Sequence, residues 1–262
     1  EPDASLLNEA DKWILSRVNR LAKDVTENMD KFELGIAVQK VYDFIWDEFC
    51  DWYVETAKYR IYHKEEEKAA ADCVLWVLKT VLKQALKLLH PFMPFITEEI
   101  YSVLVPEEES LMMSEWPQFH AEWDFPAEEN VMEHVKEITR GIRNMRAEMN
   151  VPNNRKTKVY VVCEDTEICD GISTLENSIK PLMMAEKILV QQTKENIADN
   201  AVSVVVPDAV VYLPLEDLVD FEQEMERLQK EEEKLKKEIK RAEGMLSNER
   251  FISKAPEAKV QE

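Results

Sequence analysis

Apolar residues recur at spacings of three and four over several stretches of the first 150 residues. This pattern is typical of amphipathic helices and predicts four long ones, over about 9–30, 33–62, 66–90 and 127–148. The residue before a proline avoids helical dihedrals, so His90-Pro91 ends the third helix, where His90 is a candidate C-cap. A short helix follows, for which Thr97 is a candidate cap. Five helices with mostly short links favour an antiparallel bundle.

The pattern changes after Pro152. Short β-branched runs predict strands over 158–162, 187–191 and 201–206, and a fourth run follows the turn signal Pro207-Asp208. A helix over about 168–184 separates the first two strands. Together these elements predict a small α/β module, too small to be stable alone.

From residue 216 a third pattern begins, in which apolar residues alternate at spacings of three and four between charged faces. This is a coiled-coil heptad pattern. Residues after Gly244 predict a turn and the start of a returning helix. The fold class is therefore mainly α: a helical bundle (1–150), an α/β linking module (151–215) and a coiled-coil helix (216–262). The uncovered apolar stripe of the coiled-coil helix could pair with a second copy of the chain.

The composition adds limits on location and chemistry. The 262 residues carry a formal charge of −20, which by itself disfavours nucleic acid unless basic residues cluster locally. The four cysteines form no CxxC pair, so we expect reduced thiols, a cytoplasmic location and no metal. No apolar run reaches the ~20 residues of a membrane helix, and no signal peptide is recognisable. We expect the chain to be part of a larger protein, since it starts with Glu-Pro.

Residues 42–55, YDFIWDEFCDWYVE, contain six aromatic rings. Helical spacing places Tyr42, Ile45, Phe49 and Trp52 on one face, with Tyr53 beside them, and turns Trp46 away. We expect most of these rings to fill the bundle core, since large side chains supply core volume. The other interpretation is a platform for stacking a flat partner such as a nucleobase.

Four segments carry a family resemblance: ADKWILSRVNRL (10–21), YDFIWDEFCDWYVE (42–55), LLHPFMPFITEEIY (88–101) and VYLPLEDLVD (211–220). In this order they resemble the C-terminal half of bacterial valyl-tRNA synthetases. The third segment is also similar to isoleucyl- and leucyl-tRNA synthetases, which stay as alternatives. The closing heptads and the lack of zinc cysteines favour the valyl family. A non-enzymatic scaffold with a coiled-coil tail for a protein partner is the alternative of another class.

The resemblance implies an anticodon-binding bundle, a linking module and a tRNA-binding arm. It implies a monomeric ligase that joins valine to its tRNA with ATP and magnesium. The signatures of that chemistry are missing here, so we expect no catalytic residue and no cofactor in this chain. The expected partner is a tRNA that accepts valine.

Three residues are candidates for anticodon contact. Phe32 stands at the start of the second helix, where the resemblance implies an aromatic that stacks on an anticodon base; the alternative is a hydrophobic staple. Arg17 could bind a base edge or phosphate, or form a salt bridge to a neighbouring acid. Lys40 belongs with Arg17 to a basic group that we expect at one corner of the bundle: Lys12, Arg17, Arg20, Lys23, Lys31 and Lys40.

Three further residues are candidates for contact with the tRNA backbone or elbow. Arg143 and Arg146 are three apart and predict one basic ridge, or an ordinary solvated face. Arg241 matches the position of an elbow-contacting arginine in the resembled family. Its alternative is a charged coiled-coil flank.

Overall fold

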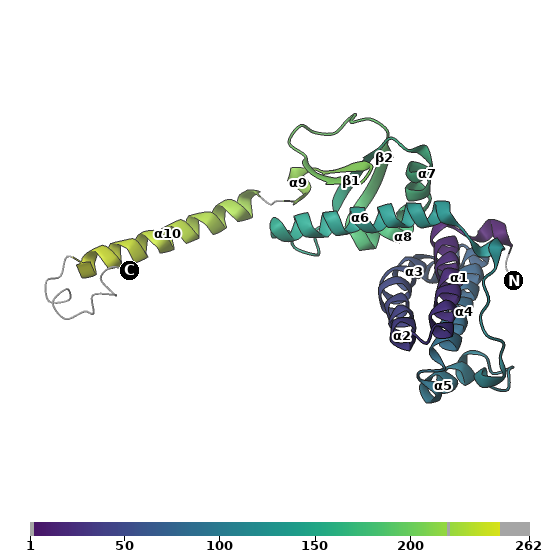
Figure 1. Ribbon diagram of the computed structural model, residues 1–262. Helices are drawn as coiled ribbons and strands as arrows, with labels where there is room; N and C mark the ends of the chain where they lie inside the picture. The colour runs from purple at the N-terminus through teal and green to yellow at the C-terminus, as the bar shows by residue number, and fades with distance from the viewer. Residues whose placement is uncertain (1–2, 219–220, 247–262) are drawn as a thin grey trace. The chain divides into compact units, whose positions relative to one another are not determined.

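The computed structural model describes residues 3–218 and 221–246 (Figure 1). The chain divides into two compact units, residues 1–214 and 215–262. The division that we predict at residues 150 and 151 stays a prediction.

The bundle is organised around α1 (Glu9–Asp30), which follows a short 3-10 turn, η1 (Ala4–Leu6). Asn8 and Asp11 close a capping box, in which each side chain accepts the backbone N–H of the other residue. The apolar face of α1 is buried, with Trp13 and Ile14 at 1% and 0% exposure. This face packs against α2, α4 and α6, which makes α1 the central helix of the bundle.

The second predicted helix is three helical segments: α2 (Leu34–Asp43), the π-helix η2 (Phe44–Val54) and α3 (Glu55–Tyr62). In a π-helix the backbone hydrogen bonds join residues five apart, so its side chains repeat at a wider spacing than in an α-helix. This spacing changes which rings of the aromatic stretch face the core.

Four of the six rings are buried, those of Phe44, Phe49, Trp52 and Tyr53. Trp46 is exposed as predicted. Tyr42 is also exposed, at 56%, so its predicted place on the core face is wrong. The α-helical spacing assumed for Tyr42 fails because the chain changes to π-helical bonding two residues later.

Two more helices and two short 3-10 turns follow in the bundle: α4 (Lys68–Leu89), α5 (Pro94–Leu104), η3 (Leu111–Met113) and η4 (Ala121–Trp123). The prediction that Thr97 caps α5 is wrong, because the helix already begins at Pro94. Proline suits this position, where its missing N–H is not needed. The buried Thr97 hydroxyl donates to the Met93 carbonyl (2.8 Å) and lies 2.8 Å from Nδ1 of His90, the C-cap residue of α4.

Helix α6 (Pro126–Glu148) joins the bundle to the α/β module. It packs against α1 on one side and against α7, α8 and β3 on the other. Two glycines make this close packing possible. A Cβ on Gly141 would lie 2.7 Å from Val204 Cγ1, and one on Gly171 of α7 would lie 2.7 Å from Val131 Cγ1 of α6.

The module contains a four-stranded sheet in the order β2-β1-β4-β3. β1 (Thr157–Cys163) and β2 (Ala185–Gln191) are parallel, whereas β3 (Val202–Val206) and β4 (Ala209–Leu213) form an antiparallel hairpin beside β1. The four predicted strands are confirmed. The single predicted helix between the first two is two helices, α7 (Thr166–Thr174) and α8 (Glu176–Met183).

The second unit contains α9 (Leu215–Leu218) and the long helix α10 (Phe221–Leu246). Apolar side chains along α10 are exposed, including Met225, Leu235 and Ile239 at 60%, 52% and 57%. Coiled-coil pairing of this stripe stays a prediction. The predicted turn and returning helix lie outside the described residues. Within the described ranges, no helix is long and apolar enough to cross a membrane.

Candidate nucleic-acid interface

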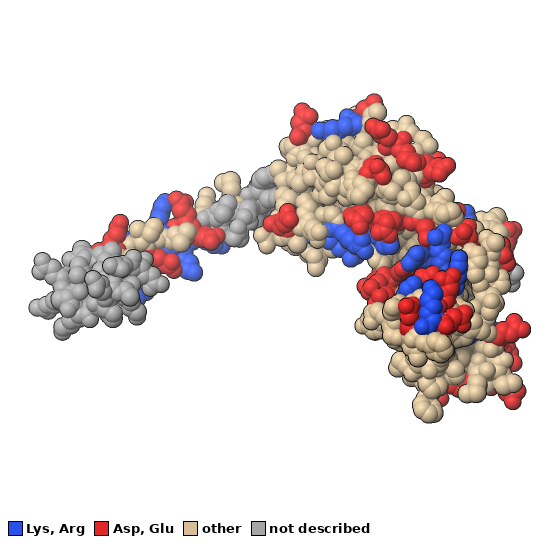
Figure 2. Space-filling view, viewed as in Figure 1, with Lys and Arg blue, Asp and Glu red and all other residues tan. Residues whose placement is uncertain are grey.

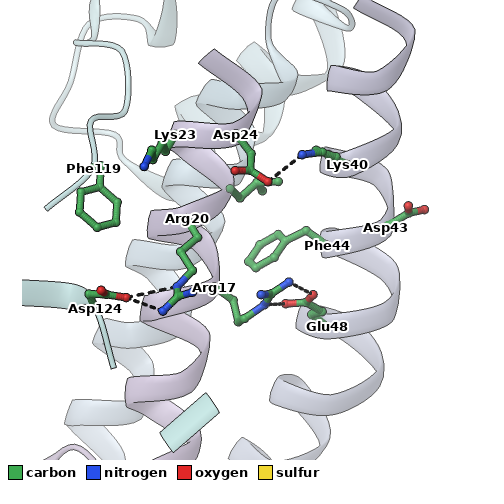
Figure 3. Close-up of a pocket in the computed structure, with 11 residues that line it drawn as sticks. Arg17, Arg20, Lys23, Asp24, Lys40, Asp43, Phe44, Glu48, Phe119 and Asp124 are labelled. Carbon is green, nitrogen blue, oxygen red and sulfur yellow. Dashed lines mark hydrogen bonds and ion pairs between the residues drawn. The ribbon is translucent and has the colours of Figure 1, made fainter. Parts of the chain in front are cut away.

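Lysine and arginine side chains gather over α1 and α6, interspersed with acids (Figure 2). The region over α1 contains a groove of about 650 Å³ between α1, the α2–η2 segment and the loop that precedes α6. Figure 3 shows its lining, which combines four cations, four acids and two aromatic rings with one leucine: Arg17, Arg20, Leu21, Lys23, Asp24, Lys40, Asp43, Phe44, Glu48, Phe119 and Asp124. The predicted basic corner around Arg17 and Lys40 is therefore a real concavity, but its charge is balanced.

Arg17 is held by a bidentate ion pair with Glu48 of η2. Its Nε and Nη2 donate to Glu48 Oε2 and Oε1, both at 2.7 Å. This geometry is the strongest form of the Arg–carboxylate bond. The hydrogen bond with Glu48 raises the pKa of Arg17 above its ordinary value. The salt-bridge alternative for Arg17 is thus present in the structure, and any RNA contact would have to add to it or replace it.

Two other groove cations are also paired. Arg20 Nη2 donates to Asp124 Oδ1 at 2.7 Å, and Lys40 Nζ to Asp24 Oδ2 at 2.7 Å. Both pairs are partly exposed, so each contributes little to stability and can exchange partners.

Lys23 differs from these three. Among the described residues, no carboxylate lies within ion-pair distance of its ammonium, which sits over the ring of Phe119 at 5.8 Å from the centroid. Phe119 is 41% exposed, and both side chains line the groove. A cation above a half-exposed ring offers a charge for a phosphate and a face for a base. Lys23 belongs to the predicted basic group, but Phe119 was not a candidate from the sequence, since it comes from a loop 96 residues away.

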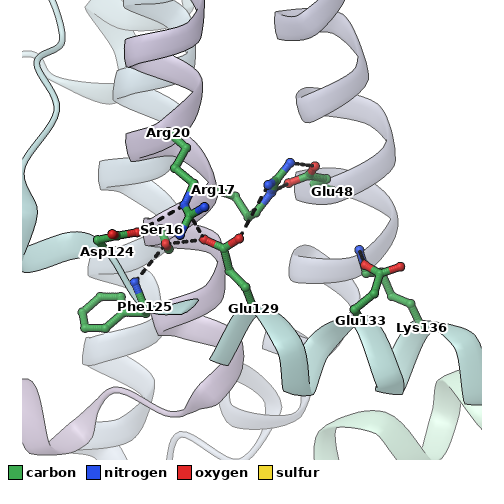
Figure 4. Close-up of polar contacts among 9 residues, drawn as sticks. All are labelled: Ser16, Arg17, Arg20, Glu48, Asp124, Phe125, Glu129, Glu133 and Lys136. Atoms are coloured by element: carbon green, nitrogen blue, oxygen red, sulfur yellow. Dashed lines mark hydrogen bonds and ion pairs between the residues drawn. The ribbon is translucent and has the colours of Figure 1, made fainter. Parts of the chain in front are cut away.

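Glu129, in the first turns of α6, ties the groove wall to α1 (Figure 4). Its carboxylate accepts from the Ser16 hydroxyl at 2.5 Å and pairs with Arg20 Nε at 3.0 Å and Arg17 Nη1 at 3.7 Å. Ser16 Oγ in turn accepts from the Phe125 N–H at 3.0 Å. This network fixes Arg17 and Arg20 relative to α6. Glu129 could not be recognised from the sequence, because its partners on α1 are more than 100 residues away.

Phe32 lies in the turn between α1 and α2, outside the groove lining, and is 88% exposed. A hydrophobic staple would bury its ring, so that alternative is wrong. Its φ of 59° places it in the left-handed region, which is uncommon for an aromatic residue. From Asp24 in the groove, α1 continues for six residues to Asp30, roughly 9 Å, and Phe32 follows in the turn. The ring thus stands free at the end of the helices that form the groove.

The predicted ridge of Arg143 and Arg146 is wrong. Arg143 is exposed and donates from Nε to the Leu182 carbonyl at 3.1 Å. Arg146 is 2% exposed, and its Nη2 donates to the carbonyls of Pro152 (3.0 Å) and Arg155 (2.6 Å). Burial lowers the pKa of Arg146. Its guanidinium therefore fastens the link between α6 and β1.

Arg241 is exposed on α10, in the second unit. The predicted contacts of Arg17, Phe32, Lys40, Arg143, Arg146 and Arg241 with RNA all stay predictions. Within the described ranges, no cluster of three His, Cys, Asp or Glu side chains could hold a metal ion.

Comparison with known proteins addresses the family. The family model described as the anticodon-binding domain of tRNA ligase matches residues 11–161, and that described as the valyl tRNA synthetase tRNA binding arm matches residues 220–262. Similar curated proteins include the valine–tRNA ligases of Clostridium perfringens (50% identical over 253 residues, 97% of this chain) and Clostridium acetobutylicum (45% over 252 residues, 96% of this chain). The chain spans 28% of the length of each. The predicted resemblance is confirmed, and the chain belongs to the family of anticodon-binding domains of tRNA ligases.

Proposed function

We propose that this chain recognises a tRNA that accepts valine, with its bundle on the anticodon arm and α10 on the RNA backbone. The observation that carries the proposal is that one chain matches both an anticodon-binding model and a valyl-type tRNA-binding arm model. We further propose that it serves a longer cytoplasmic valine–tRNA ligase. The ligase chemistry, with ATP and magnesium, then belongs to regions other than these 262 residues.

Phe32 is the proposed stacking residue for an anticodon base. Single-stranded RNA loops are read by splaying their bases onto aromatic rings, and one stack contributes about 1–3 kcal/mol. A ring that is 88% exposed at a turn has both faces open to such a base. Arg17 and Lys40, which line the groove, lie on the two helices that meet at this turn.

Lys23 is the proposed first contact for a phosphate. Its ammonium has no carboxylate to displace among the described residues, unlike those of Arg17, Arg20 and Lys40. We propose that Lys40 and Arg20 follow by exchanging their exposed carboxylates for RNA. We assign Arg143 to the backbone, and we leave the buried Arg146 out of the contact surface.

The test is a titration of the whole chain with a valine-accepting tRNA and with a copy in which the anticodon A and C are exchanged. The native anticodon is expected to bind more tightly. Phe32→Leu keeps an apolar side chain but removes the ring, so it is expected to weaken binding about tenfold and to reduce the preference between the two RNAs. Equal binding of both RNAs by the unaltered chain would refute anticodon recognition.

The charge contribution is tested by Lys23→Met at several salt concentrations. Loss of one phosphate contact is expected to weaken binding to both RNAs equally and to lower the slope of log affinity against log salt by about 1. Lys194→Met is the matched control, because Lys194 also sits over a ring, that of Tyr212 at 5.0 Å, but in the α/β module. If Lys23→Met leaves the slope of log affinity against log salt unchanged, the groove does not contact the RNA.

A further inference from the structure

Helix α5 presents an exposed apolar face that RNA recognition does not explain. Ile96, Ile100 and Val103 follow each other at helical spacing and are 49%, 40% and 77% exposed. Phe95 stands beside them at 91%, and Met93 precedes the helix at 50%. We call these five residues the α5 face. An apolar patch of this kind on a protein surface marks an interaction site.

The opposite side of α5 already makes the contacts that hold the helix in place. Thr97 and Tyr101 are fully buried, and Tyr101 packs in a cluster with Leu86 of α4 and Leu111 of η3. The α5 face is therefore not needed for the fold of the bundle, and its exposure is available for a partner.

The surroundings of the α5 face are acidic. Residues 88–135 contain no lysine or arginine. Acids flank α5 and the loop after it: Glu98, Glu99, Glu107, Glu108, Glu109 and Glu115. Figure 2 shows this end of the bundle as tan with red at its rim, whereas the blue side chains lie over α1 and α6.

Three lysines of α4 contact the loop after α5, and each already has a partner there. Lys79 and Lys83 pair with Glu107 and Glu108, and Lys87 Nζ donates to the Glu115 carbonyl at 3.1 Å. Six acids against three lysines leave the rim negative, and Glu99 is exposed on α5 itself. A phosphate backbone would be repelled here, and so would a second copy of the same acidic face.

We propose that the α5 face is a docking site for a basic amphipathic helix of another protein. The partner's apolar stripe would cover the five residues of the face, and its Lys and Arg side chains would meet the acidic rim, as in helix-in-groove recognition. The eleven residues of α5 extend over roughly 16 Å, which three to four turns of a partner helix cover. This inference does not depend on the proposed function.

The test measures fluorescence anisotropy of two labelled 18-residue peptides with the whole chain. Both peptides carry Leu and Ile at i, i+3, i+4 and i+7; one has Lys and Arg at the polar positions and the other has Glu. The basic peptide is expected to bind at least about tenfold more tightly, with a difference that shrinks as salt rises. Glu99→Lys is expected to weaken the basic peptide about threefold.

A double substitution, Phe95→Ser with Val103→Ser, is expected to weaken the basic peptide about tenfold. Both side chains are largely exposed, so the fold does not depend on them. Val205→Ser on β3 is the matched control, at 78% exposure against 77% for Val103, and it should leave binding unchanged. The proposal is overturned by equal affinity for the two peptides, by an effect of Val205→Ser equal to that of the double substitution, by displacement of the peptide with tRNA, or by a dimer that the double substitution dissociates.

Discussion

A buried ionic cluster gives the sharpest test of how the bundle is held together. The Asp11 carboxylate is fully buried, and its Oδ1 accepts from the Tyr53 hydroxyl at 2.7 Å and from Arg60 Nη2 at 2.5 Å. Its Oδ2 accepts from the Asn8 N–H at 3.0 Å. Arg60→Met keeps most of the side-chain volume but leaves the carboxylate without its counter-charge.

Removing one partner of a buried pair costs about 3–5 kcal/mol, because the other charge stays buried and uncompensated. We expect about 3 kcal/mol, the low end, since the two remaining donors still satisfy Asp11 and the Arg60 side chain is 10% exposed. The exposed pair of Lys58 and Glu55 on the same helix is the control, and Lys58→Met should leave the stability nearly unchanged.

Urea unfolding followed by tryptophan fluorescence measures this difference. All six tryptophans lie between residues 13 and 123, so the signal reports the bundle and not α10. With urea m-values of about 1–3 kcal/mol/M, the Arg60→Met midpoint should fall by roughly 1–3 M. A shift no larger than that of Lys58→Met would show that the cluster does not stabilise the bundle.

Two further predictions concern packing and pH. In urea unfolding, Gly171→Ala should be about 1–3 kcal/mol less stable than Gly35→Ala. A Cβ at position 171 would lie within 2.8 Å of both methyl groups of Val131, whereas a Cβ at position 35 has no neighbour within 4 Å. Adding Val131→Ala to Gly171→Ala should recover much of the lost stability. The hydrogen bond from Lys83 lowers the pKa of Glu108, so the folded protein binds fewer protons there than the unfolded chain. That contribution is present above the ordinary value of 4.5 and is lost as the pH falls toward the folded-state pKa; urea midpoints from pH 7 to pH 3 should therefore fall less in Glu108→Gln, and an equal fall would contradict it.

The sequence pattern was enough to predict most of the helices and strands, because most of them bury one apolar face. The 22 residues of α1 follow from apolar spacing, and the strands of the sheet follow from short β-branched runs. The π-helix η2 could not be predicted in this way, since apolar residues at spacings of three and four indicate α-helical bonding. A helix-period argument consequently placed Tyr42 on the wrong face.

The charged residues were harder to interpret than the apolar ones, because a charge is defined by its partners in space. Arg143 and Arg146 look alike in sequence, yet one is exposed and the other is 2% exposed and bonded to carbonyls. Arg17 pairs with an acid 31 residues away and Arg20 with one 104 residues away. Spacing along one helix contains no information about such partners.

The net negative charge of the chain is compatible with RNA binding, because acids that contribute to it are paired in space with the cations of the groove. In the groove, Glu48, Asp24 and Asp124 act as internal counterions for the cations that RNA would meet. A phosphate that replaced Glu48 on Arg17 would break two hydrogen bonds of 2.7 Å and leave a carboxylate that is only 19% exposed. That exchange is unfavourable, so Arg17 serves better to shape the groove than to bind the backbone. We therefore propose that RNA contacts the two groups that would lose no existing ion pair, the ammonium of Lys23 and the exposed ring of Phe32.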